Sequence, residues 1–424
     1  MGAAGIRPQR GLGVRGAEVT DTPDSVASVS AIVITYRPDL GMLERCLTSL
    51  ATSRPRPLEV VLVDNSPESE AVERLARAAL AGEGAPELVF LAQGRNLGYA
   101  AATNAGVSAS SGDLVLLLNP DATLGEGALG FLVAAAAANP EALGFAPKIL
   151  LTSPAYAIDS VGMALGGGAE GTQRGLGQVD AGQYDRPERV AGLCFAGALI
   201  RRPGFFEARV GPLDGRYFMF YEDVDWSLRA AVLGECFLTV PAAVVVHFHS
   251  ASTRSLGQGF KIRLIQRNLI WTAIKNLELE PALRVLIRRS LANLRWAARG
   301  RYPGASIRAV LEAWAGLPEM LSARRELQRR RRRRDREVLG LEGQVSFFDV
   351  DRYEPDLSAA ALVAVIGRLY ALRPSPELQG LLLRLQSAEN TGLGRDRRLL
   401  AAMVRESGID LGPGLTWMVA ELER

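Results

Sequence analysis

The sequence has few of the residues on which several common classes of site depend. It contains only three cysteines, far apart, which excludes a disulfide-stapled fold and a Cys-x-x-Cys zinc site and is typical of a reducing cytosol. Three of its 49 basic residues are lysine and none follows a glycine, so the Gly-Lys-Ser/Thr loop of P-loop nucleotide hydrolases is absent. Its longest apolar run, from Gly127 to Ala138, is shorter than the roughly 18 to 20 residues that cross a bilayer.

Length and charge indicate how the chain is organised. With 424 residues, 48% of them hydrophobic, it can bury the cores of about two or three domains. The first 28 residues lack the apolar block of a secretory signal, so we expect a disordered tail and a cytoplasmic protein. The net charge of +3 hides an asymmetry, because Lys261 to Arg334 holds 19 basic and 5 acidic residues. Such a segment is typical of a membrane or nucleic-acid contact, or of a solvated helix face.

Short apolar runs alternate with helix-like stretches in the first third of the chain. The runs are Ala31–Tyr36, Leu58–Asp64, Glu87–Leu91 and Asp113–Asn119. Between the first two, leucines recur at helical spacing from Leu40 to Leu50. Continuous apolar runs suit strands buried on both faces, and strands that alternate with helices form parallel sheets. The pattern therefore predicts an α/β fold with a mostly parallel sheet flanked by helices.

Polar residues follow each of these predicted strands. In open α/β sheets, ligands bind beyond the carboxyl ends of the strands, so the residues directly after each strand matter most. These residues are Thr35-Tyr36, Asp64-Asn65, Gly94-Arg95-Asn96 and Asn119-Pro120-Asp121. A single such residue is often an ordinary turn former, but polar residues after four strands along one edge of the sheet favour a binding site.

Acidic residues and the two histidines of the chain form a second group. Glu222, Asp223 and Asp225 crowd the start of a predicted helix. One acid would suffice to complement the helix dipole, whereas three within four residues suggest a site. His247 and His249 follow a predicted strand, where a metal-binding role and a structural role are both open.

These residue types suit the transfer of a group from a diphosphate. Such a substrate needs Mg²⁺ or Mn²⁺, which is held by a few oxygen or imidazole ligands while phosphate oxygens complete the shell. Asp121 and His247 supply ligands of that kind. Asp223 is a candidate general base toward a sugar hydroxyl, and Asp64 is a candidate acceptor of hydrogen bonds from a nucleobase or ribose.

Together and in this order, the motifs resemble those of the inverting family 2 glycosyltransferases with the GT-A fold, especially a rhamnosyltransferase-like branch. The resemblance covers about Ser28 to Leu277. It rests on Ile34-Thr-Tyr36, Val63-Asp-Asn65, the segment Asn96–Asn104, Leu118-Asn-Pro-Asp121, Gly197-Ala198, the segment Phe220–Arg229 and the segment at His247.

The resemblance implies a role for each matching residue. Asp223 corresponds to the catalytic base, Asp121 to the last acid of the Asp-x-Asp metal motif, and His247 to a further metal ligand. Asn119 stands in place of the first acid of that motif. The implied cofactor is a divalent cation, Mg²⁺ or Mn²⁺. The implied nucleotide-binding residues are Thr35, Tyr36, Asp64, Asn96 and Asn119, and those near the donor sugar or acceptor are Gly197, Ala198, Glu222, Asp225 and Trp226.

The implied reaction moves a sugar from a nucleotide-sugar donor to a hydroxyl of a cell-surface glycan or lipid-linked acceptor. Asp223 deprotonates that hydroxyl as its oxygen attacks the anomeric carbon, and the metal neutralises the departing nucleoside diphosphate. The branch favours dTDP-rhamnose as donor, with UDP-galactofuranose and other UDP-hexoses as alternatives. The alternative of another class is a non-catalytic nucleotide-sugar-binding scaffold at the membrane.

We expect four parts along the chain. They are the tail (1–28), a GT-A domain (29–258), a basic helical region (259–340) and a small helical C-terminal unit (341–424). Within the second part, the glycine-rich segment from Ala155 to Tyr184 is expected to be a flexible active-site loop or a disordered insertion. The run from Arg329 to Arg334 is expected to attach the protein to the anionic inner face of the plasma membrane, with a solvated helix face as the alternative. Nucleic acid is the weakest candidate, because stacking aromatics and a binding module are missing.

Overall fold

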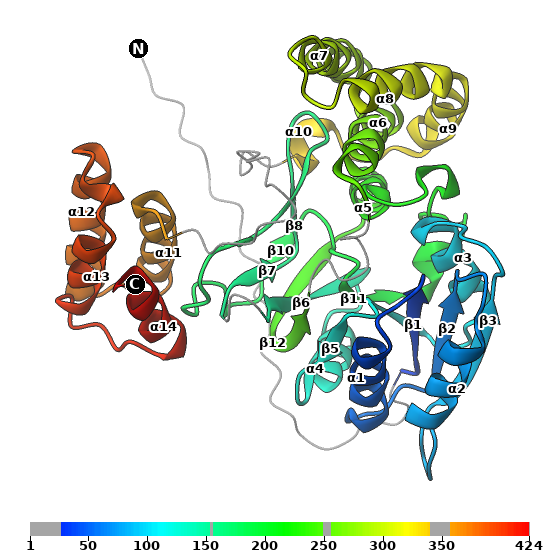
Figure 1. Ribbon diagram of the computed structural model, residues 1–424, viewed down its shortest axis with the longest axis horizontal. Coiled ribbons are helices and arrows are strands. Elements are labelled where there is room, and N and C mark those ends of the chain that lie inside the picture. The colour runs from blue at the N-terminus through cyan, green and yellow to red at the C-terminus, as the bar shows by residue number, and fades with distance from the viewer. Residues whose placement is uncertain (1–26, 153–155, 249–255, 340–356, 424) are drawn as a thin grey trace.

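A mixed sheet lies at the centre of the protein, with helices on both faces (Figure 1). The computed structural model describes residues 27–152, 156–248, 256–339 and 357–423, so most of the expected tail lies outside the described residues. Four parallel strands in the order β4-β1-β2-β3 form one half of the sheet. These strands are β1 (Val29–Thr35), β2 (Glu59–Asp64), β3 (Glu87–Ala92) and β4 (Leu114–Leu118). Every residue of β1, β2 and β4 is buried, as their continuous apolar runs predict.

The second half of the sheet contains both strand directions and brings distant segments to the same edge. Its order beyond β4 is β11-β6-β12-β10, and β11 is antiparallel to both of its neighbours. Its strands are β5 (Ala122–Leu124), β6 (Gly144–Leu151), β7 (Ile158–Ser160), β10 (Arg189–Val190), β11 (Gly197–Arg201) and β12 (Phe237–His247). Short β5 pairs with the end of β12, which places His247 opposite Ala122.

Helices cover the two faces of the sheet with separate apolar clusters. On one face, α1, α2 and α4 pack against the sheet through side chains such as Leu43, Leu47 and Leu132. On the other face, α3 and α5 pack through Val107 and Trp226. The helices are α1 (Leu40–Thr52), α2 (Glu70–Ala79), α3 (Tyr99–Ala109), α4 (Ala128–Ala138) and α5 (Glu222–Val232). The predicted fold class, an α/β sheet flanked by helices, is therefore confirmed.

The described part of the glycine-rich segment contains regular secondary structure. After β7 it forms a two-stranded hairpin of β8 (Met163–Leu165) and β9 (Gly171–Gln173). The expectation of a flexible loop or disordered insertion was wrong for these residues. Strands of three residues are too short to show a hydrophobic period, and their pairing depends on partners elsewhere in the fold.

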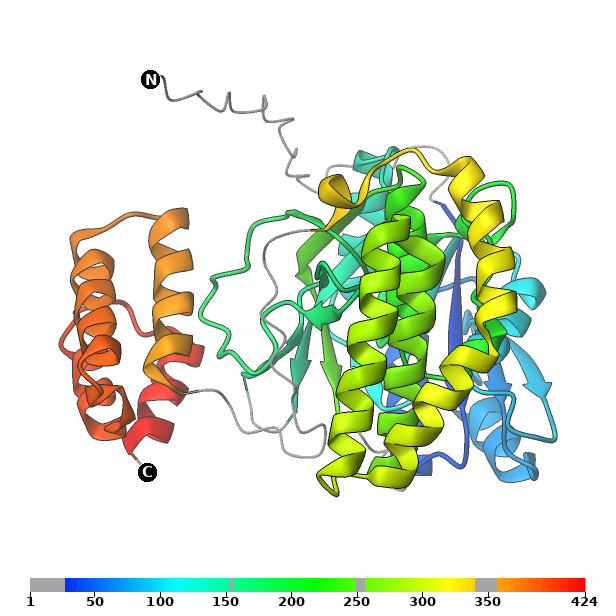
Figure 2. The same ribbon diagram turned by 90° about the horizontal axis from the view of Figure 1, so that it is seen from above.

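Two helical layers follow the sheet. The first lies in front of it in Figure 2 and comprises α6 (Gln258–Asn276), α7 (Leu279–Ala298), α8 (Pro303–Ala315), α9 (Leu317–Arg330) and α10 (Asp335–Val338). The second, on the left of Figures 1 and 2, comprises α11 (Ala359–Leu372), α12 (Pro376–Asn390), α13 (Arg397–Arg405) and α14 (Pro413–Glu423) around a core of its own. Within the described ranges, no helix is both long and apolar enough to cross a membrane.

Candidate active site

Asp64 ends β2 with one carboxylate oxygen engaged and the other unsatisfied. Its Oδ1 accepts hydrogen bonds from the hydroxyls of Thr35 (2.9 Å) and Ser66 (2.7 Å). Thr35 holds this position because β1 and β2 pair in parallel with the two residues in register. Oδ2 is buried and has no hydrogen-bond partner among the described residues. A buried, unpaired carboxylate oxygen calls for a donor, and an N–H group of a ligand would satisfy it.

The segment that begins at Asn96 connects this edge to the loop before α5. The Asn96 side chain accepts a hydrogen bond from the backbone nitrogen of Gly98 at 2.9 Å. Gly98 has a φ of +80°, and a Cβ there would lie 2.4 Å from the carbonyl oxygen of Phe218, so only glycine fits. Next to it, the Ala100 nitrogen donates to that same carbonyl oxygen at 3.2 Å. Tyr36 lies half-buried at the end of β1, with the Arg37 guanidinium over its ring.

His247 lies between two carboxylates at the end of β12. Its Nε2 atom is 3.3 Å from Asp121 Oδ1 and 3.3 Å from Asn119 Nδ2, and its Nδ1 atom is 2.7 Å from Asp159 Oδ2. Burial lowers the pKa of His247, but the hydrogen bonds with Asp121 and Asp159 outweigh it and raise that pKa to about 10. The pairing of β5 with β12 produces this geometry, because it sets Asp121 and His247 side by side.

Asp159 is a residue of this cluster that the sequence reasoning missed. It lies in β7, inside the glycine-rich segment, and is buried. The signal in the sequence was a single acid within the apolar stretch Ala157 to Val161, which is a weak one. A carboxylate on the second nitrogen of a histidine fixes the tautomer and the ring orientation, and here it directs Nε2 toward Asp121.

Asp121 and His247 fit a divalent cation as two of its ligands. A carboxylate oxygen and an imidazole nitrogen are donors that Mn²⁺ accepts, and these two converge to 3.3 Å. Across the described ranges, no group of three or more His, Cys, Asp or Glu side chains could hold a metal by itself. The remaining coordination positions would therefore fall to phosphate oxygens and water, as is usual for such ions at diphosphates.

Asp223 lies in the first turn of α5, beside Glu222. Its carboxylate accepts a hydrogen bond from the Val224 backbone nitrogen at 2.8 Å, and the backbone of Phe195 lies beside it. Burial raises the pKa of Asp223 to about 6, although these backbone groups oppose the shift. Burial and the charge of Asp223 raise the pKa of Glu222 well above its ordinary value. Asp223 therefore ionises closer to neutral pH than an ordinary aspartate does.

The segment from Cys194 to Ala196 contacts both Asp223 and the strand end that carries Asn119. On one side, the Phe195 backbone lies beside Asp223 and lowers its pKa; on the other, the Ala196 carbonyl accepts a hydrogen bond from the Asn119 nitrogen at 3.1 Å. Burial, and then the charges of Asp159 and Asp223 together, raise the pKa of the Cys194 thiol. The base candidate and the metal-ligand candidates thus lie around one short segment. The predicted Gly197-Ala198 pair follows it directly, at the start of β11 beside β4.

Comparisons with known proteins agree with this arrangement. Residues 30–204 match the family model of glycosyl transferase family 2. Over 248 residues the chain is 31% identical to an N-acetylglucosaminyl-diphospho-decaprenol L-rhamnosyltransferase of Mycobacterium tuberculosis (strain CDC 1551 / Oshkosh), a match that covers 52% of this chain and 76% of that protein. The protein of the same name from strain ATCC 25618 / H37Rv matches equally. The chain belongs to glycosyl transferase family 2.

A solved structure shows the fold of this family 2 glycosyltransferase. The crystal structure of GalNAc-T7 with UDP, GalNAc and Mn²⁺ superposes with a TM-score of 0.52 and 17% identity, covering 72% of this chain. The chain spans about half, 55%, of that protein. The predicted family and the predicted GT-A fold are both confirmed.

Two of the residues predicted near the donor sugar or acceptor form their hydrogen bonds inside the glycosyltransferase. Asp225 is fully buried and accepts hydrogen bonds from Lys275 Nζ (2.9 Å) and Asn276 Nδ2 (2.8 Å) of α6. Trp226 is also fully buried, and its indole donates to the Gly211 carbonyl at 3.0 Å. In the structure these side chains position α5, and their role toward donor or acceptor stays a prediction.

The run from Arg329 to Arg334 is only partly available to a membrane. Three of its guanidinium groups bind backbone carbonyls of the sheet domain and of α6. These are Arg330 with Arg209, Arg331 with Asn276, and Arg333 with Gly234. Arg329, Arg332 and Arg334 are exposed, so half of the run helps to attach the end of α9 and its following segment to the protein.

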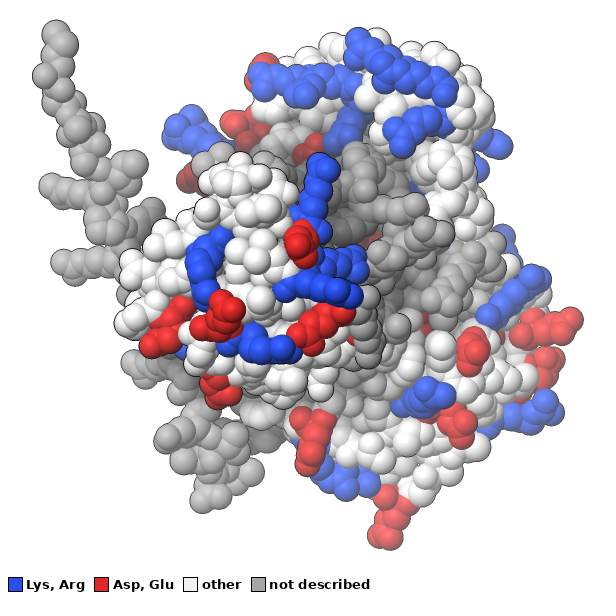
Figure 3. Space-filling model, turned by 60° about the vertical axis from the view of Figure 1, so that its left-hand side comes forward, with Lys and Arg blue, Asp and Glu red and all other residues white. Residues whose placement is uncertain are grey.

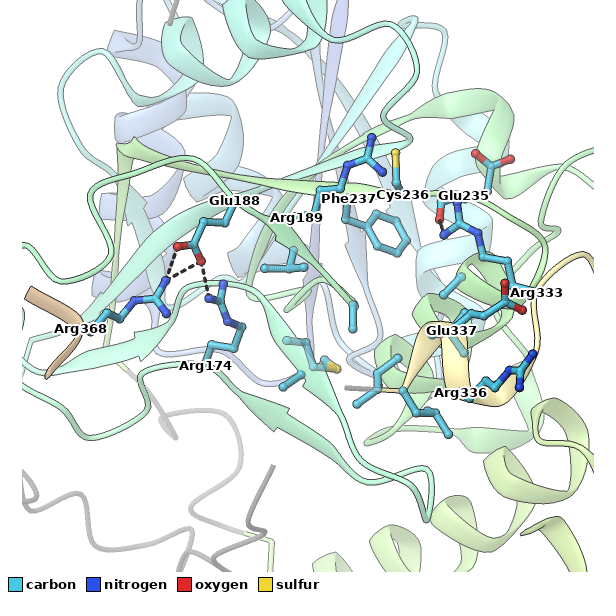
Figure 4. Close-up of a pocket in the computed structure, with 18 residues that line it drawn as sticks. Arg174, Glu188, Arg189, Glu235, Cys236, Phe237, Arg333, Arg336, Glu337 and Arg368 are labelled. Carbon is cyan, nitrogen blue, oxygen red and sulfur yellow. Dashed lines mark hydrogen bonds and ion pairs between the residues drawn. The ribbon is translucent and has the colours of Figure 1, made fainter. Parts of the chain in front are cut away.

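A large cavity of the glycosyltransferase lies outside this group of side chains (Figure 4). It has a volume of about 770 Å³, and its lining includes Cys236 just before β12 and Ala231 of α5, but none of Asp64, Asp121, Asp223 and His247. The cavity is lined by Glu188, which binds Arg174 and Arg368 and so links α11 to the sheet domain. Its size alone would make it the default ligand site, but the predicted site residues do not line it.

Proposed function

We propose that this glycosyltransferase transfers rhamnose from dTDP-rhamnose to a hydroxyl of a lipid-linked glycan, with inversion at the anomeric carbon. The relative in Mycobacterium tuberculosis supports rhamnose as the sugar, because its name specifies an L-rhamnosyl group and an N-acetylglucosaminyl-diphospho-decaprenol acceptor. UDP-galactofuranose and other UDP-hexoses are the competing donors. The supporting observation in the structure is the placement of Asp223 and the Asp121–His247 pair on the two sides of the segment from Cys194 to Ala196.

In this proposal, the side chains of the chain divide the work of binding and proton transfer. The unpaired Oδ2 of Asp64 accepts a hydrogen bond from an N–H group of the nucleobase. Asp223, ionised near neutral pH, takes the proton of the acceptor hydroxyl as its oxygen attacks the anomeric carbon. Asp121 and His247 hold a divalent cation, Mg²⁺ or Mn²⁺, at the diphosphate. When bound, that cation supplies charge neutralisation for the departing nucleoside diphosphate.

We also propose that the protein works at the cytoplasmic face of the membrane, where a lipid-linked acceptor presents its sugar. The exposed Arg329, Arg332 and Arg334 favour an anionic leaflet at this position.

Calorimetry with a panel of dTDP- and UDP-sugars, with and without Mn²⁺, tests the donor. We expect saturable, Mn²⁺-assisted binding of dTDP-rhamnose that Asp64→Ala abolishes. Tight binding of a UDP-sugar instead would keep the enzyme class and change the donor. Binding of no nucleotide sugar would contradict the proposal.

Asp223→Asn tests the mechanism, because it preserves size and removes the base. We expect donor binding to survive while transfer, followed by NMR of the product anomer, is lost. Substantial turnover by this variant would remove Asp223 from the role of base, and binding without transfer by the wild type would favour a non-catalytic scaffold.

A further inference from the structure

Helix α7 carries a second apolar face that no part of the described chain covers. Leu283, Ile287, Leu291 and Leu294 are 45–55% exposed and recur at helical spacing, so they form one stripe along the helix. The side of α7 that packs on the protein uses other residues, among them Leu286 and the buried polar Ser290 and Asn293. A contiguous exposed apolar surface of this kind usually marks an interaction site.

Helix α8 extends this stripe. Ile307, Leu311 and Trp314 are exposed on α8 at positions i, i+4 and i+7. The Trp314 indole donates to the Ser290 hydroxyl of α7 at 3.0 Å, so its ring bridges the two helices. We call this surface the α7–α8 face, and its apolar members are Leu283, Ile287, Leu291, Leu294, Ile307, Leu311 and Trp314.

Arginines border the α7–α8 face. From Leu279 to Ala315 the chain has seven arginines and two glutamates, and both glutamates are ion-paired, Glu280 with Arg284 and Glu312 with Arg263. A groove of about 650 Å³ runs beside the stripe. Its charged lining comes mostly from α7, namely Arg284, Arg288, Arg289 and Arg295, opposite Glu170 of the hairpin. Figure 3 shows basic side chains gathered at the top of the molecule, next to uncharged surface.

We propose that the α7–α8 face docks on a bilayer that contains anionic phospholipid. The apolar stripe enters the interfacial region, and the arginines of the groove contact lipid phosphates, as in amphipathic helices that lie in the membrane plane. A bilayer fits better than a second copy of the chain. A two-fold contact through this face would set the arginine border of one copy against that of the other. The inference does not depend on the identity of the donor sugar.

Helix α6 connects the α7–α8 face with the loop that leads into Asp223, which we call the catalytic loop. It packs against both α7 and α8, and the Asn268 side chain on it donates to the carbonyls of Tyr217 (3.1 Å) and Phe220 (2.7 Å). Those carbonyls belong to the loop that leads into Asp223. Docking through this face would therefore hold the base at a fixed height above the lipid surface from which a lipid-linked acceptor projects.

Flotation of the full chain with vesicles tests the proposal. The wild type should bind vesicles of phosphatidylcholine mixed with phosphatidylglycerol at least about tenfold better than phosphatidylcholine alone. Combining Ile287→Gln, Leu291→Gln and Leu311→Gln should lower binding about tenfold or more. The matched control is Leu383→Gln on α12, whose leucine is 59% exposed against 55% for Ile287, and it should bind as the wild type does.

A second variant and an assay of sugar transfer distinguish loss of vesicle binding from misfolding and from failure of the proposed function. Arg288→Gln with Arg295→Gln should reduce binding only to the anionic vesicles. Transfer to a water-soluble acceptor should be unchanged in all these variants, so a failure of the transferase assignment would appear in the wild type, without vesicles. Equal binding to both vesicle types would overturn the proposal, as would full binding by the triple glutamine variant. So would a concentration-dependent dimer, without vesicle binding, that this variant abolishes.

The last control concerns the run from Arg329 to Arg334, whose membrane attachment was predicted from the sequence. The exposed members of that run can be removed together, as Arg329→Gln, Arg332→Gln and Arg334→Gln. We expect this variant to lose less binding to anionic vesicles than the α7–α8 variants lose, because the run adds charge but no apolar contact. If it loses binding while the α7–α8 variants keep theirs, the attachment belongs to the end of α9 and the α7–α8 face is not the docking surface.

Discussion

The ionisation of Asp223 offers a quantitative test of its assignment as the base. Burial raises its pKa to about 6, above the ordinary value for aspartate. A general base acts in its deprotonated form, so kcat/KM should follow the ionised fraction of Asp223 and rise with pH. With a pKa of about 6, that fraction is roughly 0.9 at pH 7 and roughly 0.1 at pH 5. We therefore expect kcat/KM to fall about tenfold over this interval.

The assay is the initial rate of transfer across this pH range at saturating Mn²⁺, with donor binding measured in parallel. Saturating metal keeps titration of the Asp121–His247 pair out of the profile. Glu222→Gln is the control, because burial and the charge of Asp223 also raise the pKa of Glu222: if Asp223 is the titrating group, the midpoint should stay in place. A profile that is flat down to about pH 5 would refute the reasoning, and a midpoint displaced by Glu222→Gln would transfer the titration to Glu222.

Three further predictions concern binding and stability. Asp64→Ala should weaken donor binding at least about tenfold in calorimetry, and unchanged affinity would contradict the role of its unpaired oxygen. Lys275→Ala removes the cation that pairs with both buried Asp225 and Asp214 and should cost about 3–5 kcal/mol in urea unfolding, whereas Arg77→Ala at an exposed ion pair should cost at most about 1 kcal/mol; equal costs would be inconsistent with a buried network. Asp159→Asn should weaken Mn²⁺ binding about 10- to 100-fold by titration calorimetry without changing metal-free donor binding, and an unaltered Mn²⁺ affinity would count against a positioning role.

The parallel half of the sheet could be predicted because burial leaves a direct trace in its sequence. Strands β1, β2 and β4 are buried on both faces, so they read as continuous apolar runs with polar exits. The two apolar stretches before His247 form a single strand, β12, with a register shift between Val240 and Val244. Very short strands such as β5 and β7 give no period, so their pairing is set by tertiary contacts that a local pattern does not contain.

In the candidate site, too, the sequence could not reveal contacts that depend on the tertiary fold. Asp64 and Asp121 follow predicted strands, and their position at the sheet edge could be deduced from strand order alone. Asp159 lies 88 residues before His247 and meets it only because β7 folds back on β6, which pairs with β12. For Asp225, the sequence pattern did not reveal the partners that bind it inside the protein. Its place in an acidic motif suggested a substrate contact, whereas α6, more than 40 residues later, brings the lysine and asparagine that bind it.

Helix α6 carries contacts to both sides of the catalytic loop. Asn268 binds the carbonyls that precede Asp223, and Lys275 binds Asp225 just after it, so the proposed base lies between two points fixed to the same helix. The outer helices pack on α6 directly, without a flexible linker between them and the catalytic loop. The distance from the α7–α8 face to the base is therefore set by packed side chains. An enzyme built in this way would select acceptors by how far their hydroxyl stands above the lipid surface, in addition to any contact with the sugar itself.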